Sequence, residues 1–403
     1  MERKILHLDL DAFFCSVEEL LDPSLNGKAF AVGGNPQGRG VVSSCSYTAR
    51  KFGVHSAMPM ARAIFLCPQL ILIHHRHGLY GEYSDKVMDI LREYTPLFEQ
   101  VSVDEAFLDV SDLPQPINGI AKEIQDRVDR EVKLPCSIGA ATNKLVAKVA
   151  NDYGKSRIKT GQAPRQITVV PPGEEAAFLR PLDIQALWGI GPKTSQKLHS
   201  RGIHTIGQLA DLTQAESSVF FGKYAQEVRE KALGMDDSPV HTVHETKSVS
   251  NEVTFSSDTA DLEQLSTTLR KLSDKVGFRL RKAKLAGNVI QIKLRYSDFT
   301  TLTRQKALGN LTNLDDEIYQ TAEKLLHENL IPGRKVRLIG VGVNNLREPF
   351  RQLSFWEPET VEKQNLSVAI DALKEKYGKD IITRASMIKS DPKTPGKSLD
   401  HEE

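Results

Sequence analysis

The sequence KILHLDLDAFF, at residues 4–14, decides the fold of the N-terminal half of the chain. Residues 4–10 alternate in polarity and are mostly apolar, which predicts a strand buried on one or both faces. Asp9 lies at the end of this strand. A helix is predicted to follow over residues 15–21, and it stops at Asp22-Pro23 because proline cannot continue a helix.

The segments downstream repeat this alternation of strand and helix. They predict a helix over 79–94, which ends before Pro96, and two strands around a tight turn within 98–110. A second helix over 117–131 and a last strand over 136–140 follow. The order of strand, helix, hairpin, helix and strand is that of a ferredoxin-like sheet, for which we expect helices on one face. Residues 22–76 are then a large insertion after the first strand and helix.

The rest of the chain divides into a helical part, a linker, a mixed part and a tail. Residues 171–235 read as short helices only, and residues 236–246 are polar and predict a linker. Residues 247–346 mix strands with helices, and residues 347–403 form a tail with one helical stretch. In these two parts the expected strands are 289–295 and 336–343, and the expected helices are about 261–285, 314–329 and 363–376. The fold class is therefore α+β with several domains.

Composition excludes several classes of protein. Of the 403 residues, 40% are hydrophobic and 26% are charged, which are values of globular proteins. No apolar run approaches the roughly 20 residues of a membrane helix, and Asp9 and Asp11 interrupt the first apolar segment too early for a signal peptide. The 4 cysteines lie far apart without a C-x-x-C pair, which argues against a zinc site or a disulfide framework. We therefore expect a cytoplasmic protein with no membrane partner.

Three carboxylates are predicted to meet at one edge of the ferredoxin-like sheet. Asp9 ends the first strand, and Asp104 and Glu105 lie at the turn of the neighbouring hairpin. Carboxylates clustered among apolar neighbours resist ionisation, and a hard cation such as Mg²⁺ or Mn²⁺ removes that conflict. Two such ions would support phosphoryl transfer. The alternative is that all three are ordinary turn residues. For Asp11, which precedes a helix, we expect a turn or capping role.

Several motifs that include these carboxylates resemble those of the Y-family DNA polymerases, in particular the DNA polymerase IV group. They are DLDAFF at 9–14, SYTARKFGV at 46–54, SVDEA at 102–106, SIGAATNKLVAK at 137–148 and YSDFTT at 296–301. They follow the order and spacing of the family from residue 4 to about residue 346. Agreement of several motifs is far more specific than any one of them.

This resemblance implies an architecture and a reaction. It makes residues 1–21 and 77–170 the palm, 22–76 the fingers, 171–235 the thumb and 247–346 the little finger. The implied enzyme is a low-fidelity translesion polymerase without proofreading, which adds deoxynucleotides to a primer 3′-hydroxyl under the direction of a template. Its implied partners are primer–template DNA and deoxynucleoside triphosphates. We expect it to act as a monomer at the nucleoid in the cytoplasm.

The resemblance also implies roles for single residues of the palm and fingers. Asp9, Asp104 and Glu105 match the carboxylates that hold two Mg²⁺ ions, or Mn²⁺, and the carbonyl of Leu10 would be a further ligand. The match also includes a set of nucleotide-binding residues, which are Phe14, Tyr47, Arg50 and Lys155. After Lys155 the Pro-Asn-Gly usual in the family is replaced by Ser-Arg-Ile.

Phe14 matches the aromatic steric gate of the family. A ring under the sugar would clash with a ribose 2′-hydroxyl, so deoxynucleotides are preferred through repulsion of ribonucleotides. The neighbouring Phe13 is predicted to be an ordinary core residue. The small side chains of Ser43 and Ser44 would form a loose roof over the new base pair.

Three further features predict contact with DNA. Gly189, Gly191 and Lys193, in LWGIGPKT at 187–194, give a helix-hairpin-helix signal, in which a helix N-terminus faces a phosphate. Seven cations against one anion between residues 270 and 284 predict either a solvated helix face or a phosphate-binding stripe. Arg295 and Arg304 flank the YSDFTT motif and are expected to reach phosphates.

A short peptide after the last domain predicts a protein partner. Gln352, Leu353, Phe355 and Trp356 resemble the peptide by which bacterial polymerases dock on the sliding clamp, an extended segment with apolar anchors. The alternative is that Phe355 and Trp356 pack on the preceding domain. Two other classes of function also stay open: a non-catalytic Y-family-like scaffold that binds DNA, and a helix-hairpin-helix DNA-binding protein with an unrelated, phosphatase-like acidic site.

Overall fold

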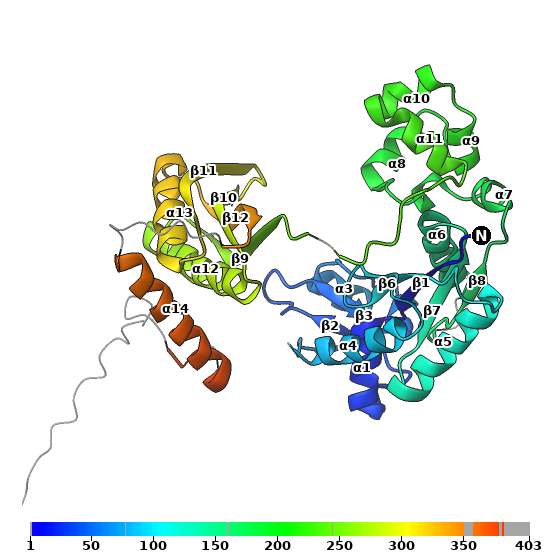
Figure 1. The fold of residues 1–403 in the computed structure, drawn as a ribbon, viewed down its shortest axis with the longest axis horizontal. Coiled ribbons are helices and arrows are strands. Elements are labelled where there is room, and N and C mark those ends of the chain that lie inside the picture. The colour runs from blue at the N-terminus through cyan, green and yellow to red at the C-terminus, as the bar shows by residue number, and fades with distance from the viewer. Residues whose placement is uncertain are drawn as a thin grey trace, which may run out of the picture. The chain divides into compact units, whose positions relative to one another are not determined.

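The computed structural model describes residues 2–76, 78–158, 161–243, 245–349, 358–378 and 381–382. The chain divides into two compact units, Met1–His244 and Glu245–Glu403. Figure 1 shows their strands and helices. In the part of the chain that the structure describes, no helix combines the length and apolar character needed to span a bilayer.

A five-stranded sheet forms the centre of the first unit. Its strands are β1 (Ile5–Leu10), β5 (Phe98–Gln100), β6 (Glu105–Asp109), β7 (Cys136–Ala141) and β8 (Ile167–Val169). Their order in the sheet is β5-β6-β1-β7-β8. The first four strands are antiparallel neighbours in the ferredoxin-like order that the sequence predicts, and that prediction is confirmed. The sequence did not predict β8, which pairs with β7 in parallel.

Helices cover both faces of this sheet, so the prediction of helices on one face only is wrong. The helices α1 (Phe13–Leu21), α4 (Leu79–Arg92) and α5 (Ile117–Val132) share one core with Leu6 and Leu8. The helix α6 (Lys144–Ser156) packs on the opposite face with Ile5 and Phe107. Since Ile5, Leu6 and Leu8 are all fully buried, β1 is apolar on both faces and requires cover on both.

The backbone of α6 comes so close to β7 that only glycine fits at position 139. A Cβ atom on Gly139 would lie well inside contact distance of the Ala147 carbonyl oxygen and the Asn151 nitrogen, both of them backbone atoms of α6. We expect Gly139→Ala to lower the free energy of unfolding by about 3 kcal/mol, because the helix must shift outward. Thermal or urea unfolding measures this. The matched control is Gly119→Ala on α5, where a Cβ meets no atom within 4 Å and the substitution is expected to be neutral or stabilising.

Residues 22–76 form a small sheet with its own core. Its strands are β2 (Phe30–Gly33), β3 (Val42–Cys45) and β4 (Ile71–Ile73), and its helices are α2 (Tyr47–Arg50) and α3 (Met60–Leu66), preceded by the single turn η1 (Pro23–Leu25). The order is β3-β2-β4, with β4 parallel to β2. Val42, Met60 and Ala63 belong to the core between them. This sheet continues from α1 and returns to α4, as expected of an insertion.

Residues 171–235 contain helices and no strand, as the sequence predicts. The helices are α7 (Glu175–Leu179), α8 (Pro192–His199), α9 (Ile206–Ala210), α10 (Gln214–Phe221) and α11 (Ala225–Ala232), with the short turns η2 (Ile184–Ala186) and η3 (Gly222–Tyr224). Figure 1 shows α8–α11 as one cluster, coloured green. Their buried residues join the core on the α6 side of the large sheet.

The first half of the predicted linker is fastened to the first unit. The Asp236 carboxylate accepts a hydrogen bond from the Leu145 N–H at the start of α6, at 3.0 Å. The buried Glu99 carboxylate accepts a bond from the His241 N–H at 2.7 Å and pairs with Lys144 at 2.6 Å. Asp236 therefore serves a helix N-terminus and the His241 backbone serves a buried ion pair, which composition alone does not reveal.

The second unit contains a four-stranded antiparallel sheet, order β11-β10-β12-β9, with helices on one face. Its elements are β9 (Ser248–Thr259), α12 (Leu262–Lys282), β10 (Ala286–Tyr296), β11 (Thr301–Thr312), α13 (Asp315–Asn329), β12 (Val336–Arg347) and α14 (Pro358–Tyr377). Ile290, Ile292 and Leu294 face the core under α12 and α13. The alternating residues, among them Lys293 and Arg295, lie on the other, polar face.

Most of the cationic run of residues 270–284 lies on α12, and two of its three arginines form ion pairs within the unit. Arg270 pairs with Asp274 at 3.3 Å and with Asp316. Arg281 lies between Asp315, at 2.8 Å, and Asp371 of α14, at 2.6 Å. These pairs take Arg270 and Arg281 out of a phosphate-binding stripe. Lys271, Lys275 and Arg279 are exposed on the same helix, and contact of this part of the run with duplex DNA stays a prediction.

Candidate active site

The pairing of β1 with β6 brings the three predicted carboxylates to one end of the sheet. Asp9 lies directly opposite Glu105 in the antiparallel register. The Leu10 N–H donates a hydrogen bond to the Asp104 carbonyl oxygen at 2.9 Å. The Ser102 hydroxyl shapes the turn between β5 and β6, because it accepts bonds from the N–H groups of Asp104 and Glu105, at 3.2 and 3.0 Å. The sequence therefore predicted this meeting of distant residues correctly.

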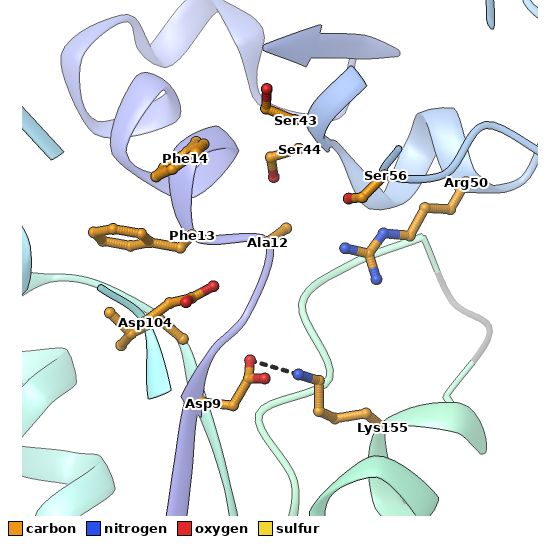
Figure 2. Close-up of a pocket in the computed structure, with 11 residues that line it drawn as sticks. Asp9, Ala12, Phe13, Phe14, Ser43, Ser44, Arg50, Ser56, Asp104 and Lys155 are labelled. Atoms are coloured by element: carbon orange, nitrogen blue, oxygen red, sulfur yellow. Dashed lines mark hydrogen bonds and ion pairs between the residues drawn. The ribbon is translucent and has the colours of Figure 1, made fainter. Parts of the chain in front are cut away.

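Two of the three carboxylates line a small pocket of about 170 Å³. Its wall consists of Asp9, Leu10, Ala12, Phe13, Phe14, Ser43, Ser44, Arg50, Ser56, Asp104 and Lys155. Figure 2 shows Asp9 and Asp104 on one side of it, Phe14 and the two serines on another, and Arg50 beside them. Glu105 is not part of this wall.

Two lysines of α6 pair with the carboxylates. The Lys155 Nζ atom lies 2.5 Å from an Asp9 carboxylate oxygen, the contact drawn as a dashed line in Figure 2. The Lys148 Nζ atom lies 3.2 and 3.3 Å from the two oxygens of Glu105. Because the two lysines are seven residues apart, they lie on one face of the helix, two turns from each other. Lys148 therefore holds Glu105 on the α6 side of the sheet.

The electrostatics of the carboxylates follow from these neighbours. Burial raises the pKa of Asp9 to about 7, an effect that Lys155 opposes and that Glu105 and Asp104 strengthen. The His7 imidazole, together with Lys148, holds the pKa of Glu105 well below its ordinary value. Buried negative charge at Asp9 is therefore costly unless a cation is nearby.

The donor set of the pocket wall fits a hard divalent cation. Among the described residues, no three His, Cys, Asp or Glu side chains are grouped as a metal site. The pocket wall nevertheless offers the carboxylates of Asp9 and Asp104, oxygen ligands of the kind that Mg²⁺ and Mn²⁺ prefer. Lys155 now supplies the positive charge that a metal ion would bring to Asp9.

Of the turn or capping role predicted for Asp11, the structure shows the turn. The N-cap of α1 is Ala12, which has a left-handed backbone with φ 47° and makes no side-chain capping bond. Asp11 lies in the turn, as expected, but its fully buried carboxylate accepts bonds from the Ser137 hydroxyl, at 2.9 Å, and from the Arg165 N–H, at 3.0 Å. It ties β1 to β7 and to the chain before β8.

The two phenylalanines at the start of α1 have different surroundings. Phe13 is buried in the core under the sheet, which confirms its prediction. Phe14 is half-buried in the pocket wall. Its ring stacks on Tyr80 of α4, with centroids 4.4 Å apart and planes at 27°, and meets the edge of His75 at 5.5 Å. Ser43, in the same wall, is 2.6 Å from the His75 Nε2 atom.

The inserted sheet contributes a cation and an unsatisfied hydroxyl. The Arg50 guanidinium lies over the Tyr47 ring, 4.3 Å from its centroid, and reaches the pocket. Ser46 caps α2 by accepting a bond from the Ala49 N–H, which fixes this short helix. The Tyr47 hydroxyl is buried and has no hydrogen-bond partner among the described residues. Burial also raises the pKa of Tyr47, so the hydroxyl stays a donor.

Three residues of this site were not predicted from the sequence. Lys148 donates a hydrogen bond to Glu105, Ser102 accepts a bond from the Glu105 N–H in the turn, and the Tyr80 ring stacks on Phe14. The seven-residue spacing between Lys148 and Lys155 is a signal that could have revealed the first. No local pattern marks Tyr80, because its partners lie on another helix.

The predicted DNA-contacting residues lie in different parts of the fold. Gly189 has φ 103°, a conformation that favours glycine, and Gly191 is the N-cap of α8, with Pro192 at the first helical position. In the second unit, Arg295 lies on the polar face of the sheet. Arg304 pairs across the strands with Ile292 and therefore lies on the helix side, where it contacts Asn329 of α13. The two arginines thus do not share one surface.

Lys193 follows Pro192 on α8 and is exposed. The peptide predicted to bind a sliding clamp, with Gln352, Leu353, Phe355 and Trp356, lies outside the described residues.

Comparisons with known proteins cover most of the chain. The profile of the impB/mucB/samB family matches residues 8–152, that of its C-terminal domain matches 246–355, and that of its HHH motif matches 172–203. DNA polymerase IV of Dehalococcoides mccartyi is 43% identical over 380 residues, 93% of this chain and 95% of that protein. DNA polymerase IV of Desulfatibacillum aliphaticivorans is 38% identical over 397 residues, 96% of this chain and 97% of that protein.

Solved structures of similar fold include a Y-family DNA polymerase chimera, with a TM-score of 0.75 and 27% identity. An insertion ternary complex of Dbh DNA polymerase has a TM-score of 0.59 and 29% identity. Each comparison covers 85% of this chain and 98% of the other.

Proposed function

The chain belongs to the impB/mucB/samB family of Y-family polymerases and is a DNA-directed DNA polymerase of the translesion type, and from this premise we propose how its residues carry the reaction. The reaction is attack of a primer 3′-hydroxyl on the α-phosphate of a deoxynucleoside triphosphate, with release of pyrophosphate. The observation that supports this site most strongly is the register of β1 and β6, which sets Asp9 opposite Glu105 and beside Asp104.

Asp9, Asp104 and Glu105 would hold two Mg²⁺ ions, with the Leu10 carbonyl as a further ligand. The ions would supply charge stabilisation at the attacking and leaving oxygens. The chain itself binds and orients the substrate. Tyr47 and Arg50 donate hydrogen bonds to the triphosphate, which gives the buried Tyr47 hydroxyl the partner it lacks. Phe14 lies under the sugar, and Ser43 and Ser44 leave room above the base.

The function is tested by primer extension with the full chain and Mg²⁺ on undamaged and damaged templates. We expect extension on both, with nucleotide choice that follows the template. Failure of the chain to extend any primer would favour the non-catalytic scaffold. Activity that ignores the template sequence would favour the unrelated, phosphatase-like site.

Lys155 has a second proposed role besides its pairing with Asp9. With Asp9 as a metal ligand, the Lys155 ammonium would be available to bind the triphosphate. We expect Lys155→Met to raise KM for the nucleotide by about tenfold or more, the worth of one charge-assisted hydrogen bond, with a smaller effect on kcat. Steady-state insertion of one nucleotide measures this. Arg157→Met, two residues later and exposed, is the control and should leave KM unchanged.

DNA would be held without regard to sequence at two places. The N-terminus of α8, after Gly189 and Gly191, can direct free N–H groups at a phosphate, with Lys193 beside it. Arg295, on the polar sheet face of the second unit, is available for a second backbone contact. Arg304 lies on the other side of that sheet and is not part of this surface.

The peptide at 352–356 is proposed to bind a sliding clamp, and the polymerase is proposed to act on DNA as a monomer. The support for this is its sequence, in which Leu353, Phe355 and Trp356 would serve as apolar anchors in a groove of the partner. Such tethering raises the effective concentration of the polymerase at its template.

A further inference from the structure

We infer that Tyr80 is a positioning residue for sugar selection, because its ring stacks on Phe14 while its hydroxyl is anchored on Glu18 of the same helix. The inference rests on the proposed role of Phe14 as the steric gate. It concerns a residue of α4, outside the pocket wall, which neither the motifs nor the pocket itself identifies.

The contacts of Tyr80 connect two successive turns of α1. Its ring stacks on Phe14, with centroids 4.4 Å apart, and its hydroxyl donates a hydrogen bond to the Glu18 carboxylate at 2.7 Å. Phe14 and Glu18 are four residues apart and therefore lie on one face of that helix. Tyr80 thus cannot slide along α1 or tilt away from Phe14 without breaking one of these contacts.

The hydrogen bond to Glu18 is well protected. Glu18 is fully buried; one carboxylate oxygen accepts the Tyr80 bond, and the other lies 3.1 Å from the Arg76 guanidinium as an ion pair without a hydrogen bond among the described residues. Burial, and then the neighbouring Glu18, raise the pKa of Tyr80, so the hydroxyl stays protonated and remains a donor. A buried acid that loses its partner is strongly destabilised, which makes this anchor difficult to break.

Phe14 makes a second aromatic contact, with His75. The His75 ring meets Phe14 edge-on at 5.5 Å and Tyr80 at 6.1 Å, also edge-on. Because Ser43 contacts the His75 ring at 2.6 Å, this support comes from the inserted small sheet. Phe14 therefore contacts one stacked ring, Tyr80, and one perpendicular ring, His75.

Rigidity decides how well a steric gate works. A mobile ring can turn away and make room for a ribose 2′-hydroxyl. A ring that is packed against its neighbours cannot, so the hydroxyl either clashes with it or has to displace the neighbours as well. Loss of the Tyr80 ring removes the stacking contact that opposes this displacement. The selectivity of Phe14 is then only partly retained, although Phe14 itself is unchanged.

The experiment compares insertion of a ribonucleotide and of the matching deoxynucleotide by the full chain with Mg²⁺. The readout is the ratio of the two kcat/KM values, which a general loss of folded enzyme does not change. We expect Tyr80→Leu to raise relative use of the ribonucleotide by about tenfold, the size expected for one lost aromatic pair. Tyr80→Phe keeps the stack and loses the Glu18 bond, so we expect a smaller rise.

The matched control is Tyr83→Leu, the same substitution one turn later on α4, where the ring faces Lys86. It should leave the ratio unchanged. Thermal unfolding shows whether each variant is folded. If Tyr80→Leu is not folded, the ratio measured for Tyr80→Phe is used to test the inference. An unchanged ratio in the folded Tyr80 variants, together with a raised ratio in Phe14→Ala, refutes the role of Tyr80 but leaves the role of Phe14 as the gate intact. An unchanged ratio in Phe14→Ala refutes the gate and, with it, this inference.

Discussion

Replacing Asp104 by alanine is expected to reduce primer extension by about a thousandfold or more while binding of primer–template DNA is kept. The carboxylate lines the pocket beside Asp9, and its loss removes charge from the position where the two metal ions are proposed to bind. Preorganised charges at a reacting phosphate are worth this much in rate, and no neighbouring acid lies in the pocket wall to replace Asp104 except Asp9. Single-turnover insertion and a gel-shift titration measure the two properties.

Asp112→Ala is the matched control, because Asp112 is an exposed acid shortly after the same strand. It should extend primers like the unchanged chain. Extension that survives Asp104→Ala would contradict the proposed metal-binding role. Loss of DNA binding together with activity would point instead to misfolding of the hairpin, which the Ser102 contact to Asp104 holds in shape.

Phe14→Ala is expected to raise ribonucleotide incorporation relative to deoxynucleotide incorporation by about a hundredfold. The substitution removes the ring from the pocket wall, so a 2′-hydroxyl no longer meets an atom it must displace. Rejection of one added hydroxyl by an apolar contact reaches about this size. Competition between the two nucleotides on one primer, resolved by alkaline cleavage of the product, measures the ratio directly.

Phe65→Ala serves as control, since Phe65 is 75% exposed on α3 and lies outside the pocket wall. Its ratio should equal that of the unchanged chain. A ratio for Phe14→Ala within about twofold of that value would show that sugar choice depends on another group.

The apolar pattern of residues 4–10 and the hairpin at 98–110 were enough to predict the order of the four antiparallel strands and the meeting of Asp9 with Asp104 and Glu105, but not the parallel strand β8. Pairing follows from burial, and burial is visible in the sequence. β9 and β11 were missed because most of their residues are exposed. Edge strands of this kind carry little apolar alternation and are stabilised by their neighbours.

Side-chain direction was the part that the sequence could not reveal. Glu105 is adjacent to Asp104 in the chain, yet it lies outside the pocket wall and contacts Lys148 on α6. Asp11 shares the parity of Asp9 along β1, but its carboxylate is taken up by Ser137 and the backbone at Arg165. In both cases a partner distant in sequence decides which carboxylate faces the pocket.

The bridge that Arg281 makes between Asp315 and Asp371 bears on any test of the peptide that is proposed to bind a clamp. A chain shortened before Gln352 would lose α14 along with the peptide and leave Arg281 with one acidic partner in place of two. A weaker response to a clamp could then result either from the missing peptide or from a less stable second unit. Alanines at Leu353, Phe355 and Trp356 in the full-length chain separate these causes.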